Sequence, residues 1–580
     1  MGNYFLDNED IQFALKNLDL KKLAELQELY ADNGSADYAP MDGQDAVEGY
    51  AEILKIVGAI AADTIAPSAE QVDLEGNTLN DDGTVTLNPL VQKNLDKLAQ
   101  GDMLGFTLPR RYGGLNCPNL VYTMATEIVS RADCSFMNMF GLQGIAETIN
   151  AFASQEIKDM SLPRFCNGEV TGAMVLTEPD AGSDLQAVRL RADLTEDGKW
   201  VLNGVKRFIT NGCGEILLVL ARSEHDISDG RGLSLYYVES DETVKVRHLE
   251  SKLGIHGSPT CELTFTNTPA LLVGERQRGL ITYVMALMNG ARVGIAAQSL
   301  GVAEAAFRLA RSYAAAREQF GAPIENLPPV AELLVDMRVK IEASRALTYH
   351  TCTVCDVENN GQRLTETPGV PKEIVTAQRK AARAAKRVNG MLTPMSKYYG
   401  SEMAIEVSNM GVQVLGGSGY IKDYAAERYV RDARITSIYE GTSQLQVVAA
   451  IKGLTSGTFE SYITETFESK SYDCPILSAL KDKLVEAKAQ TVEAINFAKE
   501  VSTSYVDLSA RKLVDCAIDI LVGHLLLAQG AVCERKAAVA KYFIEKRLPV
   551  IAANCATVLN NNQQAMDDYK LIVGDVPAAE

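Results

Sequence analysis

The chain has 580 residues, and at roughly 100–200 residues per domain this length predicts about three to four structural units. Apolar residues make up 47% and charged residues 23%, a composition that supplies a large core and excludes a wholly disordered chain. The net charge of −19 repels phosphate backbones and anionic lipids, so we expect no nucleic-acid partner and no membrane attachment.

The N-terminus, MGNYFLDNED, is acidic and lacks the features of a signal peptide. The eleven cysteines are scattered along the chain, which favours reduced thiols in a cytoplasmic protein over a disulfide framework. Cys352 and Cys355 form a CxxC motif with no second pair at zinc-site spacing. We interpret them as buried or incidental thiols, with metal or redox chemistry as the alternative, and predict no metal site.

The first third of the chain is predicted to be a helical domain over residues 1–169. Apolar residues recur at helical spacing over 1–60 and again over 91–99 and 120–131. The intervening residues 64–90 are rich in Pro, Gly, Asn and Asp, which indicates a long loop.

A second domain is predicted over residues 170–275. Short runs rich in β-branched and aromatic residues, such as KWVLNGVKRFITNG, ILLVLARS and GLSLYYVE, alternate with Gly, Asn, Asp and Ser clusters. This pattern is typical of an antiparallel β domain.

The rest of the chain is again helical, with a third domain predicted over 276–451 and an additional C-terminal helical domain over 452–580. Gly residues at 416–419 interrupt the helical pattern, and residues 452–475 resemble a linker or loop. The apolar stretch 518–532 is too short to span a bilayer, so we interpret it as a buried helix. The predicted fold class is therefore α+β, mostly α.

Two segments carry residues suited to chemistry. The first, LTEPDAGSD over 176–184, combines Gly, Ser and Thr in a way that can bind an anion or a polar heterocycle, although an ordinary strand-to-loop turn is the alternative. In the second, over 431–444, Glu440 follows an apolar run and precedes Gly441. A partly buried carboxylate there suits general-base work, and a surface or helix-capping glutamate is the alternative.

Taken together, these segments resemble the two signatures of the acyl-CoA dehydrogenase family, TEPxAGSD and RDxxxxxIYEGTxxxQ. Other family motifs fall in the same order over roughly 100–450. They are GFTLPRRYGG at 105–114, KRFITNG at 206–212, the segments around Leu253 and Ser258, REQFG at 317–321, and Gln413 with the glycines at 416–419.

The resemblance implies FAD bound between the β domain and the second helical domain, and oxidation of an acyl-CoA thioester to the trans-2-enoyl-CoA. It implies Glu440 as the acceptor of the α-proton and flavin N5 as the hydride acceptor. The Glu440 N–H and a ribityl hydroxyl of FAD would stabilise the enolate oxygen. Some members place the base on an earlier helix, but residues 289–292 here read NGAR and contain no acid.

Further site residues follow from the resemblance alone. Expected FAD contacts are Leu176, Thr177, Ser183, Phe208, Thr210, Thr442 and Gln444 and, toward the FAD of a neighbouring subunit, Arg317, Phe320, Gln413 and Gly417. Expected substrate contacts are Ser183, Arg292 and Gly441. A shared cofactor site implies a homodimer at least, with a dimer of dimers also open, and an electron-transfer flavoprotein as electron acceptor.

The chain also departs from the family pattern. Pro328 stands where many members have Gln, residues 356–371 form a polar insert, and about 130 residues follow the usual end. This size resembles longer bacterial members, including those acting on methylthiopropionyl-CoA, and long-chain membrane-associated members. The last helices carry Arg535, Lys536, Lys541, Lys546 and Arg547, which we interpret as a solvated helix face rather than a membrane-binding one.

The acyl chain cannot be identified from these residues. Two alternatives to the dehydrogenase also stay open: a flavin-dependent acyl-CoA oxidase, and a non-catalytic family member that acts as a binding or assembly protein.

Overall fold

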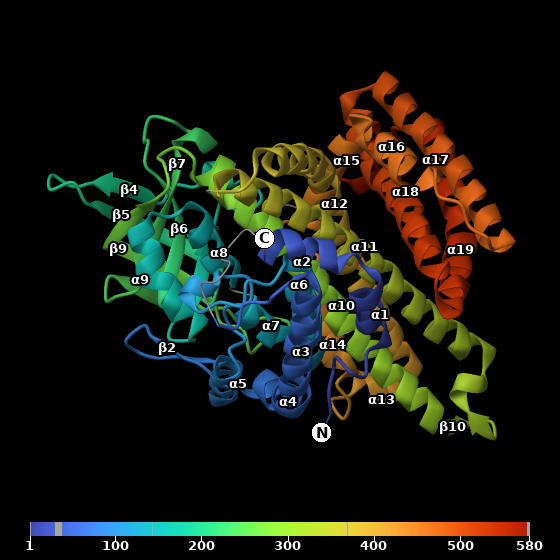
Figure 1. The fold of residues 1–580 in the computed structure, drawn as a ribbon, viewed down its shortest axis with the longest axis horizontal. Coiled ribbons are helices and arrows are strands. Elements are labelled where there is room, and N and C mark those ends of the chain that lie inside the picture. The colour runs from blue at the N-terminus through green and yellow to red at the C-terminus, as the bar shows by residue number, and fades with distance from the viewer. Residues whose placement is uncertain (1, 29–36, 142, 368, 577–580) are drawn as a thin grey trace.

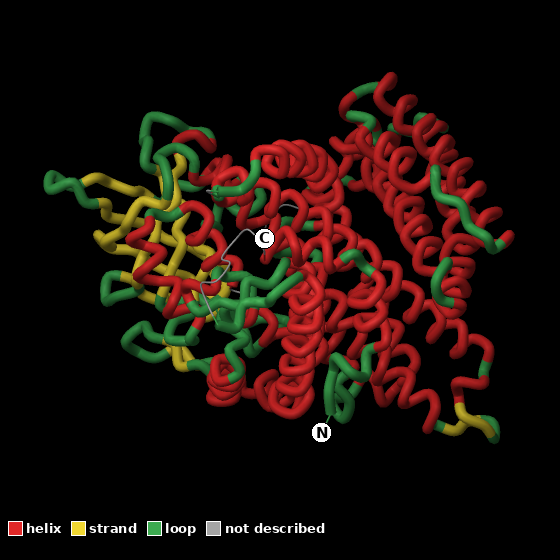
Figure 2. Tube along the Cα trace, in the orientation of Figure 1, coloured by secondary structure: helices red, strands yellow, loops and turns green. Residues whose placement is uncertain are grey.

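The computed structural model describes residues 2–28, 37–141, 143–367 and 369–576. Most strands gather at one side of the molecule and helices form most of the remainder, as Figures 1 and 2 show. This arrangement confirms the predicted α+β, mostly helical class, with helices before and after a middle β region.

The N-terminal region is helical. Asn8 and Asp42 begin the first and third helices by accepting hydrogen bonds from backbone N–H groups of the first turn. The helices are α1 Glu9–Asn17, α2 Leu20–Glu28, α3 Gly43–Ile60, α4 Ala66–Glu75, α5 Pro89–Gln100, α6 Asn119–Ala132, α7 Cys134–Phe140, α8 Gln143–Phe152 and α9 Gln155–Cys166.

The loop predicted over 64–90 is wrong for its first half. A π-helical turn, Ala61–Ile65, continues α3 directly into α4, and Pro67 lies in the first turn of α4, where a missing N–H costs nothing. Only the segment after Gly76 leaves the helix, and it forms a short hairpin of β1 Thr78–Leu79 and β2 Val85–Thr86.

The β domain is one seven-stranded sheet. Its strands are β3 Gly172–Val175, β4 Arg191–Leu194, β5 Trp200–Thr210, β6 Ile216–Arg222, β7 Leu233–Glu239, β8 Val244–Leu249 and β9 Thr260–Val273. Pairings β6–β4, β4–β5, β5–β9, β9–β7 and β7–β6 close five of these strands into a ring.

The sheet is mostly but not wholly antiparallel, which corrects the prediction. β3 runs parallel to β6 in the register Gly172↔Ile216, and β4 meets β6 in parallel at Arg191↔Arg222. β6 is buried along nearly its whole length. A strand that is covered on both faces carries a continuous apolar run. That run, ILLVLA, predicts a strand but does not say in which direction its neighbours run.

The second helical region is built on three long helices. They are α10 Met285–Ala316, α11 Pro328–Glu366 and α12 Lys372–Leu415, followed by α13 Gly417–Tyr420, α14 Ala426–Ile435 and α15 Ser443–Thr455. A hairpin of β10 Glu318–Gln319 and β11 Ala322–Pro323 connects α10 to α11 and projects at the lower right of Figure 1.

The C-terminal region forms a bundle of its own, at the upper right of Figure 1. It contains α16 Thr458–Ile463, α17 Pro475–Val501, α18 Thr503–Gly530, α19 Glu534–Leu559, α20 Gln564–Asp567 and α21 Tyr569–Val573. The linker predicted over 452–475 is therefore mostly helical, because α15 extends to Thr455 and α16 follows after Gly457 in the left-handed conformation.

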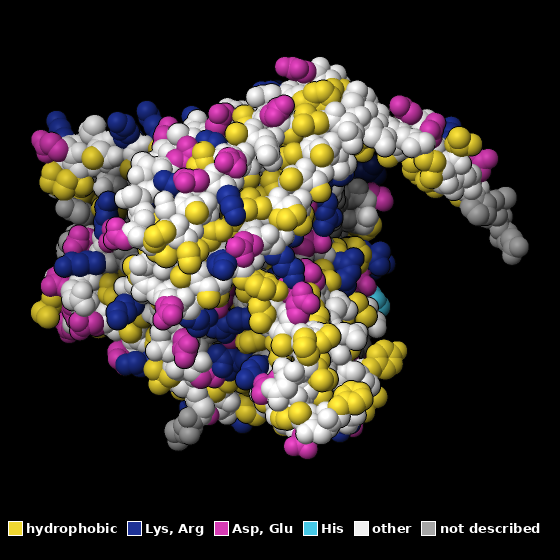
Figure 3. All heavy atoms as spheres, turned by 90° about the vertical axis from the view of Figure 1, so that its right-hand side faces the viewer, with side chains coloured by type: hydrophobic (Ala, Val, Ile, Leu, Met, Phe, Trp, Pro, Cys, Tyr) yellow, Lys and Arg dark blue, Asp and Glu magenta, His cyan; other side chains and the backbone are white. Residues whose placement is uncertain are grey.

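The apolar core of α18 matches the buried helix that the sequence predicts. This helix and Gly279–Ala316 have the length and composition of membrane-crossing helices, but 83% of the apolar window of α18 is buried inside the protein. Beyond α19, the chain projects from the body as an arm with exposed apolar side chains, seen at the right of Figure 3.

The basic stretch at the start of α19 is not the solvated face that the sequence suggests. Lys536 is buried, and its ammonium lies 2.7 Å from a carboxylate oxygen of Asp10 in α1 and 2.8 Å from one of Glu342 in α11. Arg535 contacts the same two carboxylates, so α19 joins the C-terminal bundle to the N-terminal and middle helices through buried ion pairs. Arg535, Lys541 and Lys546 are exposed, and among the described residues Lys541 is the one of the five that makes no ion pair.

Candidate active site

One end of the β domain is tied to α14, the helix that precedes the turn carrying Glu440. The N–H of Asn211, just after β5, donates to the carbonyl of Pro259 at 2.7 Å, and the same loop sends the Ile255 N–H to the Asp432 carboxylate at 2.6 Å. Asp432 lies in α14, eight residues before Glu440. These contacts form a junction between the end of the β domain and α14, the helix that leads into the Glu440 turn.

On the sheet side, a fully buried lysine fixes the turn after β3. The Lys206 ammonium donates to the Leu176 carbonyl at 2.7 Å and lies 3.0 Å from a Glu178 carboxylate oxygen. The Glu178 carboxylate also accepts the N–H groups of Arg189 and Leu190, at 2.8 and 2.9 Å. Burial lowers the pKa of Lys206 to about 8, and Glu178 opposes this.

The expected cofactor contacts of the β domain lie on this turn and at the end of β5, and they differ in exposure. Leu176 is buried, Thr177 is half-buried and Ser183 is exposed. Thr210 ends β5 in register with Thr260. Phe208 has the left-handed φ of 60° and a ring that is 52% exposed, next to a register shift between β5 and β9. Such strain in a large residue concentrates at functional sites, and here it turns an aromatic face outward.

On the helical side, Glu440 lies in a tight turn between α14 and α15. Glu440 and Gly441 have φ values of 55° and 91°, both in the left-handed region. The Gly441 carbonyl accepts from the Lys397 ammonium at 2.7 Å and from the Gln446 amide at 3.0 Å, and Gln446 also donates to the Glu440 carbonyl at 3.2 Å. Both carbonyls are thus engaged, while the Glu440 N–H has no hydrogen-bond partner among the described residues.

Burial and two cations set the proton affinity of Glu440. Desolvation raises its pKa from 4.5 to about 7, and the positive charges of Lys397 and Arg292 oppose that increase. The guanidinium of Arg292 donates to the side-chain oxygen of Asn289 at 3.1 Å and keeps its Nε without a partner among the described residues. A carboxylate whose pKa lies near neutrality can accept a proton and release it again.

The remaining predicted contacts are distributed differently. Thr442 caps α15 by accepting from the Leu445 N–H at 3.3 Å, and Gln444 is exposed. Arg317, Phe320, Gln413 and Gly417 are all exposed at the opposite end of the long helices, near the β10–β11 hairpin. Arg292 and Arg317 are 25 residues apart in the chain, mostly along α10, which corresponds to about 37 Å.

Several residues of the site are missing from the sequence-based prediction. Glu178 and Lys206 lie inside the motif segments but are not among the predicted contacts, and Lys397 and Gln446 lie outside those contacts as well. All four are buried, and Lys206, Lys397 and Gln446 donate to backbone carbonyls whereas Glu178 accepts from backbone N–H groups. A buried lysine inside the run MLTPMSKYY is a usable signal, since lysine is almost never fully buried without a partner.

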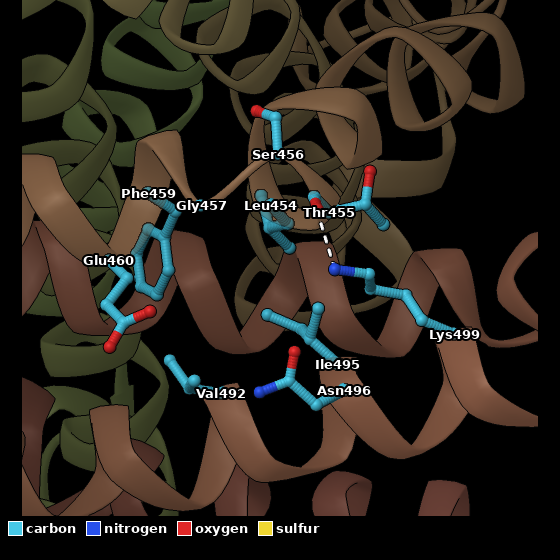
Figure 4. A pocket seen from close by; sticks show the side chains of 10 residues that line it. All are labelled: Leu454, Thr455, Ser456, Gly457, Phe459, Glu460, Val492, Ile495, Asn496 and Lys499. Atoms are coloured by element: carbon cyan, nitrogen blue, oxygen red, sulfur yellow. Dashed lines mark hydrogen bonds between the residues drawn. The ribbon is translucent and has the colours of Figure 1, made fainter.

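The pocket between α15, α16 and α17 is not part of this site. It has a volume of about 220 Å³, and Figure 4 shows Lys499 donating to the Thr455 carbonyl at its edge. The pocket lies beyond the far end of α15, so the length of this 13-residue helix, roughly 20 Å, separates it from the Glu440 turn.

The chemistry of the residues at the junction fits FAD. An exposed aromatic ring at Phe208, hydroxyls at Thr177, Thr210 and Ser183, and a free N–H at Glu440 offer stacking and hydrogen bonding to a large polar heterocycle.

Comparison with known proteins gives matches along most of the chain. The descriptions of the matching family models are acyl-CoA dehydrogenase N-terminal domain over 48–169, middle domain over 173–268, C-terminal domain over 278–454, and acyl-CoA dehydrogenase C terminal over 455–546.

An acyl-CoA dehydrogenase of Bacillus subtilis is 35% identical over 372 residues, which is 63% of this chain and 90% of that protein. The 3-methylmercaptopropionyl-CoA dehydrogenase of Ruegeria pomeroyi is 31% identical over 513 residues, 83% of this chain and 82% of that protein.

Solved structures share the fold over different lengths. Butyryl-CoA dehydrogenase from Megasphaera elsdenii matches with a TM-score of 0.59 and 28% identity, over 70% of this chain and 97% of its own. An acyl-CoA dehydrogenase from Bacillus anthracis in complex with FAD matches with a TM-score of 0.74 over 91% of this chain and 90% of its own, at 23% identity. Its likeness therefore extends over the C-terminal bundle as well.

The family models cover most of the chain, and relatives more than 30% identical align with it over most of their own length: the chain belongs to the acyl-CoA dehydrogenase family of FAD-dependent oxidoreductases.

Proposed function

We propose that this enzyme oxidises the Cα–Cβ bond of an acyl-CoA thioester to the trans-2-enoyl-CoA, with Glu440 as the base that removes the α-proton. The observation that carries the proposal is the Glu440 turn itself. The half-buried carboxylate of Glu440 has a pKa of about 7, and the backbone N–H of the same residue has no hydrogen-bond partner among the described residues. FAD, when bound, supplies the acceptor for the β-hydrogen as hydride at N5.

The turn geometry supports a second role for the backbone at Glu440. Removal of the α-proton places negative charge on the thioester oxygen, and a donor fixed in advance stabilises that charge most effectively. The carbonyls of Glu440 and Gly441 are held by Gln446 and Lys397, so the Glu440 N–H is left for the substrate. Arg292, whose side chain lies near Gly441, is positioned to contact the CoA portion.

Two groups of expected FAD contacts lie at opposite ends of the long helices. About 37 Å of helix separates the ends, farther than one FAD extends, so a single chain cannot use both groups on the same cofactor. Phe320, with its ring 92% exposed, and Arg317 would instead reach the FAD of a second chain. A homodimer is therefore part of the proposal, and a dimer of dimers remains compatible with it.

We further propose an electron-transfer flavoprotein as the electron acceptor. A solved structure that matches at 31% identity is described as an electron transferring flavoprotein of Acidaminococcus fermentans. The acyl group is open, since similar proteins have names that range from short-chain acyl-CoA to 3-methylmercaptopropionyl-CoA.

Anaerobic reduction of the bound flavin tests the proposal. The FAD-loaded enzyme is mixed with propionyl-, butyryl-, palmitoyl-, branched, aromatic and methylthiopropionyl-CoA, and loss of the flavin absorption band identifies the substrate class. Glu440→Gln should keep FAD and lose the rate of reduction by about three orders of magnitude or more, because the amide cannot accept the proton. Reduction at the wild-type rate in Glu440→Gln would contradict the assignment of the base, and rapid reoxidation by O₂ would favour an oxidase.

A further inference from the structure

The turn at Glu440 and its flanking residues are supported by three residues of α12. The Lys397 ammonium reaches the Gly441 carbonyl at 2.7 Å, the Ser401 hydroxyl reaches the Thr436 carbonyl at 2.8 Å, and Glu402 accepts the Ser443 hydroxyl at 2.6 Å. Ser401 lies four positions after Lys397 and therefore on the same side of α12, and Glu402 is the next residue along the chain.

Lys397 is an unusual choice for such a support. Its side chain is fully buried, and a neutral donor would make the same hydrogen bond without the cost of burying a charge. Among the described residues, no carboxylate lies within ion-pair distance of its ammonium. The acidic groups that act on Lys397 through space are Glu440 and Glu402, while Arg292 repels it.

The charges that face Glu440 come from two helices. Lys397 on α12 is the larger of the two influences that lower the pKa of Glu440, and Arg292 on α10 is the smaller. The neighbouring Tyr439 hydroxyl is held by Gln298 and Asn138, and burial keeps its pKa well above the ordinary range, so it stays neutral. Glu402 is bonded to Ser443 and to Arg511 of α18, so its charge is already shared with the C-terminal bundle.

We propose that Lys397 is a positioning residue that does two things for the proposed base: its hydrogen bond holds the Gly441 carbonyl so that the Glu440 N–H faces the substrate, and its charge favours the ionised form of the Glu440 carboxylate. This inference rests on Glu440 acting as the base.

The two roles predict different consequences for two substitutions. Lys397→Gln keeps a hydrogen-bond donor and loses the charge, whereas Lys397→Met loses both. We expect both variants to raise the pKa of Glu440 by about 1 unit, since a nearby cation lowers a carboxyl pKa by about that much or more. Only Lys397→Met should also lower the maximal rate reached at high pH, by about 10-fold, because it frees the turn.

The experiment measures the rate of flavin reduction from pH 6 to pH 10 in the FAD-loaded wild type, both Lys397 variants and Lys386→Met. Lys386 is exposed on the same helix and should leave the profile unchanged. In parallel, difference infrared titration of substrate-free protein follows the carboxylic C=O stretch that disappears in Glu440→Gln. It reports the same pKa without any turnover.

The outcomes separate this proposal from the proposed function. If Glu440→Gln still reduces flavin, the base assignment fails whatever the Lys397 variants do. If Glu440→Gln is inactive but the infrared and kinetic pKa values are the same in wild type, Lys397→Gln and Lys397→Met, the role of Lys397 is overturned. A loss of activity in Lys397→Met with an unshifted pKa in Lys397→Gln would also overturn it, because support of the fold alone would explain that result.

Discussion

Two buried lysines support the two sides of the candidate site, and they differ in one respect. Lys206 and Lys397 are both fully buried, both donate to a backbone carbonyl at 2.7 Å, and burial lowers the pKa of each to about 8. Lys206, however, lies 3.0 Å from the Glu178 carboxylate, which two further N–H groups stabilise. Lys397 has no such contact partner among the described residues.

The difference indicates how a buried charge can be used. A carboxylate in contact neutralises the charge of Lys206 within the β domain, so that the lysine serves only to fix the turn at Leu176. The charge of Lys397 is left to act across the site on Glu440. A buried charge lowers the stability of the fold unless a charge of opposite sign contacts it. A neutral hydrogen-bond donor would hold the Gly441 carbonyl without that cost, so the charge of Lys397 points to a role beyond structural support.

The largest effect that would test this comparison is the removal of the paired lysine. Lys206→Met should lower the free energy of unfolding by about 3–5 kcal/mol, because it leaves Glu178 buried without its cation. Loss of FAD should accompany the loss of stability, since the Leu176 turn is released. Chemical denaturation of the holoenzyme and the flavin content of the purified protein measure both.

Two controls sharpen this first test. The double variant Lys206→Met with Glu178→Gln should recover most of the lost stability, because no unpaired charge is left. Lys199→Met removes a lysine whose side chain is 77% exposed beside Asp197, and it should change stability by less than about 1 kcal/mol. Equal effects of Lys206→Met and Lys199→Met would remove the distinction between a buried and a surface ion pair.

A smaller effect is expected from the other side of the site. Gly441 has φ 91°, and an added Cβ would lie 2.6 Å from the Gln446 side-chain nitrogen. Gly441→Ala should therefore cost about 1–3 kcal/mol of stability and slow flavin reduction, since it displaces a group that holds the turn.

Gly457→Ala is the matched control for that substitution. Gly457 has a similar φ of 78°, but nothing lies within 4 Å of its added Cβ. Gly457→Ala should therefore lose only the stability that a left-handed backbone conformation costs an alanine, and its rate of flavin reduction should not change. If both glycine variants lose the same stability and the same rate, the contact between Gly441 and Gln446 is not what fixes the turn.

The smallest effect concerns alkaline pH. Both lysines have folded-state pKa values of about 8, below the ordinary 10.5, so between these values the unfolded chain holds protons that the folded chain has released. Stability therefore rises with pH across this window and shows no such slope below it. In Lys397→Met the increase in the free energy of unfolding between pH 8 and pH 10 should be smaller than in wild type by the contribution of one lysine, about 1–2 kcal/mol.

Denaturation of wild type and Lys397→Met at pH 8, 9 and 10 provides the measurement. Other buried groups also titrate in this range, but they are common to both proteins and cancel in the difference. Parallel stability curves would mean that Lys397 is not deprotonated on the folded side of this window.

The sequence predicts most of the helices, the strands and the two motif segments, because apolar periodicity and turn residues are local signals. It fails at 64–90 and 452–475, where Pro and Gly indicate breaks that helix starts and left-handed caps accommodate. It also misses the parallel pairing of β3 with β6, since strand direction depends on the path of the chain between strands.

The sequence by itself determines which chemical groups occur and in what order along the chain: a turn that contains Ser and Thr, then a carboxylate before a glycine. It also determines the family in which both segments occur. Only the tertiary structure decides what surrounds that carboxylate. Lys397 meets Gly441 across 44 residues and Lys206 meets Leu176 across 30. Such contacts depend on how helices and strands pack, and packing is a property of the whole chain. No local sequence pattern around Lys206 or Lys397 therefore shows which lysine contacts a carboxylate and which one faces the proposed base.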